Sequence, residues 1–145
     1  MFEVRGFAFS LLVLLTACSA SFSYETFLTD LLGTEQVSDI RGINNGFEDT
    51  FHYVRFVTDA QVIDAFVRAN AMTESDSFGP AVLEDWGLLH PPREVRWWRP
   101  KEVADGQIYY KEFLTERQGE QVLSHTYHLA FSPDTGVAYL VVFYP

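Results

Sequence analysis

Two of the four histidines in this 145-residue chain stand close enough in sequence to suggest a shared metal ion. They are His125 and His128 in the segment HTYH, and imidazole is a common ligand of transition metals. The surrounding residues favour a β-strand, however, where side chains three positions apart point to opposite faces unless a bulge intervenes. We therefore expect no metal and no cofactor, and interpret the histidines as two exposed residues and two packed by aromatic neighbours.

Nucleophilic and acid–base chemistry has no recognisable arrangement in the sequence. Covalent catalysis needs a serine, threonine or cysteine beside a base that a third group orients. The chain has no G-x-S-x-G turn and no glycine-rich phosphate loop. Its adjacent carboxylates, such as Glu84 and Asp85, stand in a polar segment where nothing separates their pKa values. The sequence therefore predicts no catalytic residue, and the interpretation leans away from an enzyme.

The most unusual polar segment is REVRWWRPKE, residues 93–102, which combines cations with two tryptophans. Trp and Arg are over-represented at binding hot spots, so this segment is a candidate interaction site. The candidate residues are Arg93, Arg96, Trp97, Trp98 and Arg99. On a strand the two indoles face opposite ways, and one of them is expected to pack on the core. The alternative is an edge strand whose charges discourage aggregation and whose Pro100 ends the pairing.

The only cysteine, Cys18, follows a short apolar run. Residues 6–15 are apolar apart from Ser10, a length that suits the hydrophobic region of a signal peptide. As a helix the run would reach roughly 15 Å, about half of a hydrocarbon core, so a stable transmembrane span is disfavoured. An exported domain with a single thiol also needs an explanation for that thiol. Ordinary cleavage after Ala20, which would release a secreted protein, stays open.

Residues 15–18, LTAC, resemble the lipobox of bacterial lipoproteins, in which an aliphatic and two small residues precede the cysteine. The resemblance implies cleavage before Cys18, a diacylglyceryl group on its sulfur and acylation of the new amino terminus. The membrane is then a partner through this lipid. The chain divides into a signal peptide at 1–17, a tether at 18–23 and a single domain at 24–145. For a double-membrane bacterium, Ser19 implies an outer-membrane anchor facing the periplasm.

Composition predicts that most of the chain folds as one acidic domain. The hydrophobic share is 48%, and the aromatic residues are 13 Phe, 7 Tyr and 3 Trp, which exclude global disorder. A chain of 145 residues is long enough for one core and too short for two ordinary domains. The net charge of −10 disfavours nucleic acid as a partner because the phosphates would be repelled.

The elements that must position these residues are predicted from periodicity. The spacing of apolar residues predicts a short helix over 25–33, and a capped amphipathic helix over 59–71 that follows a strand. Strands are predicted at 49–57, 94–99, 107–115, 121–131 and 137–144. The last strand is apolar on both faces and is expected to be central, whereas one face of 121–131 is expected to be exposed.

The predicted fold class is therefore α+β, an antiparallel β-meander of about five strands with one main helix on one face, preceded by a cleavable signal helix. The predicted function is a lipid-anchored cell-envelope protein that acts by binding an unidentified protein partner. Two alternatives stay open. One is an immunity-type inhibitor that neutralises a basic toxin through complementary charge. The other is an envelope enzyme or small-ligand binder with a pocket under residues 73–92.

Overall fold

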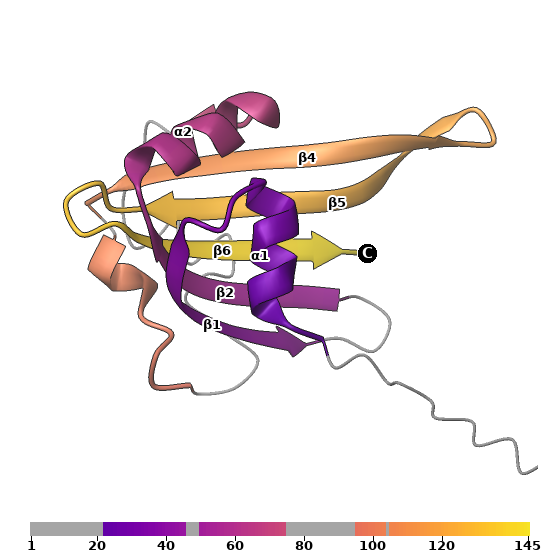
Figure 1. Ribbon diagram of the computed structural model, residues 1–145. Coiled ribbons are helices and arrows are strands. Elements are labelled where there is room, and N and C mark those ends of the chain that lie inside the picture. The colour runs from indigo at the N-terminus through magenta and orange to yellow at the C-terminus, as the bar shows by residue number, and fades with distance from the viewer. Residues whose placement is uncertain (1–21, 46–49, 75–94, 104) are drawn as a thin grey trace, which may run out of the picture.

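The computed structural model describes residues 22–45, 50–74, 95–103 and 105–145. Within them a six-stranded antiparallel sheet has the order β1-β2-β6-β5-β4-β3, and two α-helices lie on the same side of it (Figure 1). The strands are β1 (Val37–Asn45), β2 (Thr50–Thr58), β3 (Thr73–Glu74), β4 (Gln107–Arg117), β5 (Glu120–Phe131) and β6 (Val137–Tyr144). The helices are α1 (Tyr24–Leu32), α2 (Ala60–Ala69) and a short 3₁₀-helix, η1 (Pro100–Val103).

The α+β class and the antiparallel sheet predicted from the sequence are confirmed. β4, β5 and β6 follow one another as a meander, and β6 also pairs with β2. β6 is therefore central, as its apolar sequence predicts, and residues 137–142 are all buried. The sheet has six strands rather than about five, since β1 and the two-residue β3 extend its edges. The predicted signal helix lies outside the described residues.

The strand predicted over residues 94–99 is wrong for the part that the structure describes. Residues 95–99 form a turn and a loop that leads into η1. Trp98 is 7% exposed, and its indole lies edge-on to the rings of Tyr53 and Tyr139 at 5.2 and 5.0 Å. An indole buries more apolar surface on a sheet face than at a sheet edge, so this contact outweighs strand pairing. The edge-strand interpretation of the segment is therefore wrong as well.

Both faces of the sheet are covered. Under the helices, Leu28 and Ile63 pack with inward side chains of β2, β5 and β6 in one buried cluster. On the opposite face, Trp98 and Val103 pack with Tyr139 and other side chains in a second cluster. The exposed face predicted for 121–131 is wrong, because Thr126 and Ala130 on that side are 5% and 0% exposed. The alternation of apolar and polar side chains along β5 does not predict which other segments of the chain cover each face of the sheet.

The two helices cover different parts of one face. The amphipathic helix predicted over 59–71 is α2, which lies partly over the sheet and stacks Phe66 on Tyr127 of β5. The short helix predicted over 25–33 is α1, which ends at Leu32 and is capped by Gly33 with a left-handed φ of 69°. α1 packs against β1 so closely that a Cβ on Gly42 would lie 2.3 Å from the ring of Tyr24.

Candidate functional site

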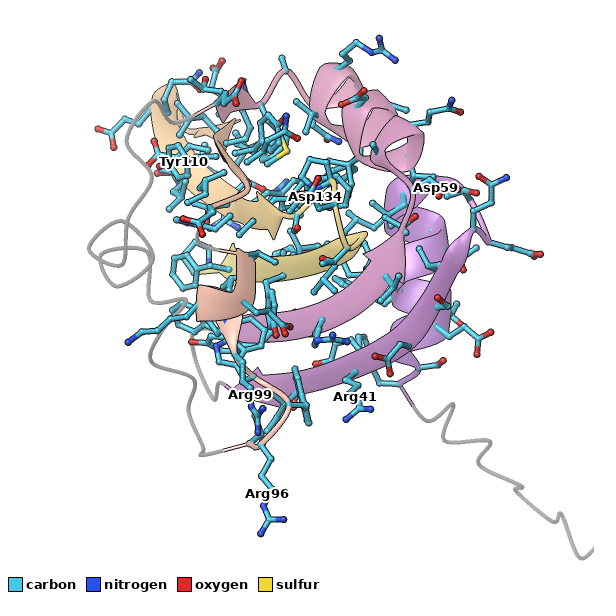
Figure 2. The ribbon with its side chains drawn as sticks, turned by 90° about the vertical axis from the view of Figure 1, so that its left-hand side faces the viewer. Arg41, Asp59, Arg96, Arg99, Tyr110 and Asp134 are labelled. Carbon is cyan, nitrogen blue, oxygen red and sulfur yellow. The ribbon has the colours of Figure 1, made fainter. Side chains whose placement is uncertain are left out.

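A groove beside β1 gathers arginines from three separate parts of the chain. Arg41 comes from β1, Arg55 from β2, and Arg96 and Arg99 from the segment that precedes η1. This arginine groove has a volume of about 340 Å³ and is lined by Asp39, Arg41, Arg55, Arg96, Trp97, Arg99 and Glu102. Figure 2 shows Arg41, Arg96 and Arg99 on the same side of the molecule, with their side chains directed outward next to β1.

A carboxylate separates the two arginines that the strands bring together. In the register of β1 and β2, Arg41 stands opposite Arg55, a placement that is unfavourable for like charges. A bulge between Ser38 and Arg41 holds Asp39 at a φ of 46°, which Asp tolerates. Asp39 accepts hydrogen bonds from Arg41 Nε at 3.2 Å and from Arg55 Nη1 at 2.5 Å. Hydrogen bonding by Arg55 accordingly lowers the pKa of Asp39.

Arg55 also joins the sheet to η1. Its side chain is 15% exposed, and its Nε donates to Glu102 Oε1 at 3.1 Å. The hydroxyl of Tyr139 on β6 donates to the same Glu102 oxygen and accepts from the backbone N–H of Arg99 at 3.2 Å. Burial and the hydrogen bond with Glu102 raise the pKa of Tyr139 to about 12. Arg55, Tyr139 and Glu102 therefore fix the wall of the groove that carries Arg99.

The remaining two arginines are available to a ligand. Arg96 and Arg99 are exposed, and neither has a carboxylate partner within the described ranges. Arg99 Nε donates to the carbonyl oxygen of Arg96 at 2.9 Å, which restrains its guanidinium. Four arginines and two carboxylates give the groove a net charge of +2 on a chain whose net charge is −10. Guanidinium groups in this setting suit the bidentate binding of a carboxylate or phosphate.

The structure brings three of the predicted interaction residues into this groove. Arg96, Trp97 and Arg99 line it, and Trp97 lies half-buried with its ring edge-on to Trp98 at 5.7 Å. Trp98 does not line the groove, because its indole is buried against the sheet. There it packs against the ring of Trp97. Arg93 and Cys18 lie outside the described residues.

Sequence reasoning missed Arg41, Arg55, Asp39 and Glu102. Arg55 did carry a signal, because it interrupts the apolar run HYVRFV of a strand. The residues on either side of it in that strand are buried. A charge in such a place needs a partner, since an unpaired buried charge is costly. The partner itself could not be predicted, because Asp39 reaches Arg55 only through the bulge of β1.

The histidines that suggested metal chemistry are packed against aromatic rings. His125 stacks on Phe113 at 4.2 Å on the helix side of the sheet, whereas His128 lies edge-on to Tyr110. His52 is 8% exposed, and His125 and His128 are half-buried. None of the three described histidines is exposed, so the prediction of two exposed histidines is wrong. In the described ranges no three His, Cys, Asp or Glu side chains are grouped so as to hold a metal ion. His90 lies outside these ranges.

Comparisons with protein-family models, with curated proteins and with solved structures find no match to this chain. Among the described residues, no helix has the length and apolar character needed to cross a membrane. The geometry of the arginine groove is therefore the basis on which a function is proposed.

Proposed function

We propose that this chain is a lipid-anchored cell-envelope protein that binds an acidic segment of a partner protein in the arginine groove. The anchor is the acylated Cys18 that the LTAC motif implies. The observation that carries the binding role is that the arginines of the groove differ in their carboxylate partners. Asp39 and Glu102 hold Arg55 in place, while Arg96 and Arg99 stay exposed and without carboxylate partners in the described part of the chain.

The charge distribution supports a short acidic ligand rather than a polyanion. A nucleic acid would be repelled by the chain's net charge of −10 along most of its length. One or two carboxylates meet only the local charge of the groove, where a guanidinium can bind each of them through two hydrogen bonds. The volume of about 340 Å³ suits one or two side chains rather than the body of a folded domain.

The shape of β1 supports binding through side chains rather than through strand addition. β1 is an outer strand of the sheet, and such a strand can pair with an extended peptide. The bulge at Asp39 interrupts its backbone ladder next to the groove, and bulges of this kind protect sheet edges from pairing. Trp97 adds a half-buried apolar surface beside the arginines, where an indole and a guanidinium together form a typical hot spot.

The binding role is tested by cross-linking in the native envelope with the intact chain. The groove variant Arg96→Glu/Arg99→Glu is compared with Arg68→Glu/Arg117→Glu, which reverses two exposed cations outside the groove. We expect an acidic peptide to be captured by the wild type and the control but lost from the groove variant. Capture that is equal in all three proteins would remove the groove as the site.

The anchor has its own test. Labelled fatty acid should be incorporated into the intact chain and not into Cys18→Ser. Equal label in both proteins would refute lipidation at Cys18.

A further inference from the structure

The described residues expose three large hydrophobic side chains, and two of them contact the same histidine at one end of the sheet. Phe22 is 56% exposed and stands four positions after Cys18. Tyr144, the last residue of β6, is 37% exposed. Both rings contact His52, with ring centroids 5.3 Å away for Phe22 and 5.9 Å away for Tyr144. The third exposed side chain, Leu114, lies on the β4–β5 hairpin.

Phe22 packs within a cluster of aromatic rings. Its centroid lies 4.9 Å from that of Tyr24 and 5.7 Å from that of Phe27, both on α1. Phe27 stacks in turn on the buried ring of His52 at 5.1 Å, and the Tyr24 hydroxyl lies 3.3 Å from His52 Nδ1. Figure 1 shows the start of α1 and the C-terminus at the same end of the molecule. The exposed rings of Phe22 and Tyr144 therefore lie against one histidine, and together they are here called the aromatic end.

The rings that form the aromatic end carry no charge at neutral pH. Its side chains are phenyl and phenol rings around His52, and burial lowers the pKa of that imidazole, so it stays neutral. An uncharged surface on a chain of net charge −10 is suited to a neutral partner. Phenyl and phenol rings partition favourably into the headgroup region of a bilayer, where tyrosines are enriched.

The tether limits how far this surface can lie from an acylated Cys18. The four residues from Cys18 to Phe22 span at most about 14 Å when fully extended. The headgroup region on each side of a bilayer is roughly 5–8 Å thick. An anchor at Cys18 therefore keeps the ring of Phe22 within reach of the headgroups.

We propose that Phe22 and Tyr144 insert into the headgroup region of the bilayer that carries the anchor, and so orient the domain on the membrane. This inference rests on the proposed lipidation of Cys18. With the domain oriented in this way, the arginine groove faces away from the bilayer and stays accessible to a partner. His52 and Arg55 are three residues apart on β2, so their side chains point to opposite faces of the sheet. The groove then lies on the face away from the His52 rings.

The test uses the intact chain, reconstituted into phosphatidylcholine vesicles that contain a phospholipid with a photoreactive headgroup. Labelled peptides are located by mass spectrometry, and the same spectra report the acyl group on Cys18. We expect label on the peptides that contain Phe22 and Tyr144. In Phe22→Ser/Tyr144→Ser, labelling of the flanking peptides should fall about tenfold. The matched control Leu114→Ser removes an exposed apolar side chain elsewhere and should label as the wild type does.

The possible failures are distinguishable. An acylated Cys18 with no label at Phe22 or Tyr144 would overturn the inference and leave the anchor intact. Cross-links between copies of the chain at Phe22, in place of lipid label, would also overturn it and identify the aromatic end as a dimer interface. Absence of the acyl group from Cys18 would overturn the anchor and the inference together.

Discussion

Arg41 and Arg55 stand opposite each other on β1 and β2, with the carboxylate of Asp39 bonded to both. The bulge that places Asp39 there thus turns a repulsive cross-strand pair into part of the arginine groove. Asp39 holds these two arginines in position and occupies part of their hydrogen-bonding capacity. Its negative charge competes with any anion that enters the groove.

Replacing Asp39 with Asn tests this relationship. Asparagine tolerates the same left-handed backbone, so the bulge should persist. We expect the free energy of unfolding to fall by about 0.5–1 kcal/mol, since the ion pairs are partly exposed and screened. Added phosphate should stabilise the variant more than the wild type, because loss of the Asp39 charge raises the net charge of the groove from +2 to +3. Asp134→Asn, on an exposed turn, is the matched control, and an equal response to phosphate in both variants would contradict the prediction.

Replacing Tyr139 with Phe tests how the groove is attached to the sheet. The hydroxyl of Tyr139 bonds Glu102 and accepts from the backbone N–H of Arg99, and the ring itself is fully buried. We expect a loss of about 1–2 kcal/mol in urea unfolding, together with weaker capture of the acidic partner. Tyr53→Phe is the control, because that ring packs in the same cluster while its hydroxyl makes no hydrogen bond to the described residues. Similar losses in the two variants would rule out a special role for the Tyr139 hydroxyl.

Replacing Gly42 with Ala tests the contact between α1 and β1. The added methyl group would meet the ring of Tyr24 at 2.3 Å, so the start of α1 must move. We expect thermal and urea unfolding to show a loss of about 1–3 kcal/mol, and headgroup labelling at Phe22 to fall because α1 carries its ring partners. Gly33→Ala is the control, since its Cβ meets open space and only the left-handed φ is strained. Unchanged labelling in Gly42→Ala would show that Phe22 does not depend on this packing.

Local patterns predicted most of the elements and the β4–β5–β6 meander, but not the pairing of β1 with β2 or of β2 with β6. α1, α2, β2, β4, β5 and β6 match predicted ranges because their periodicity and turn residues are local in sequence. β1 was missed because its bulge at Asp39 interrupts the alternation that identifies a strand. The loop at 95–99 was predicted as a strand because it is rich in aromatic residues, and its sequence does not reveal that Trp98 packs on a sheet face.

The candidate site could be predicted only in part for the same reason. Arg96, Trp97 and Arg99 lie within four consecutive positions and were recognisable from composition. Arg41 and Arg55 join them only after β1 and β2 pair in one particular register. A shift of that register by one residue would turn one of the two arginines to the other face of the sheet. The site is therefore a property of the strand pairing.

Acid should destabilise the fold through His128. Burial lowers the pKa of His128 to about 4, against a smaller raising effect of Glu112. In the unfolded chain a histidine has a pKa of about 6.5. Below that pH the unfolded chain therefore binds a proton that the folded chain excludes. The stabilising effect is complete above pH 6.5 and is lost as the pH falls towards 4. Between pH 7.5 and 5.0 the loss from this one group should be about 2 kcal/mol.

The measurement is urea unfolding of the wild type and of His128→Gln at pH 7.5 and at pH 5.0. Glutamine cannot take up a proton in this range, so the other titrating groups set the pH dependence of the variant. The variant can be less stable than the wild type at pH 7.5, because it loses the edge-on contact of His128 with Tyr110. On acidification it should lose about 2 kcal/mol less than the wild type. Equal losses in the two proteins would mean that His128 takes up its proton as readily in the folded chain as in the unfolded one.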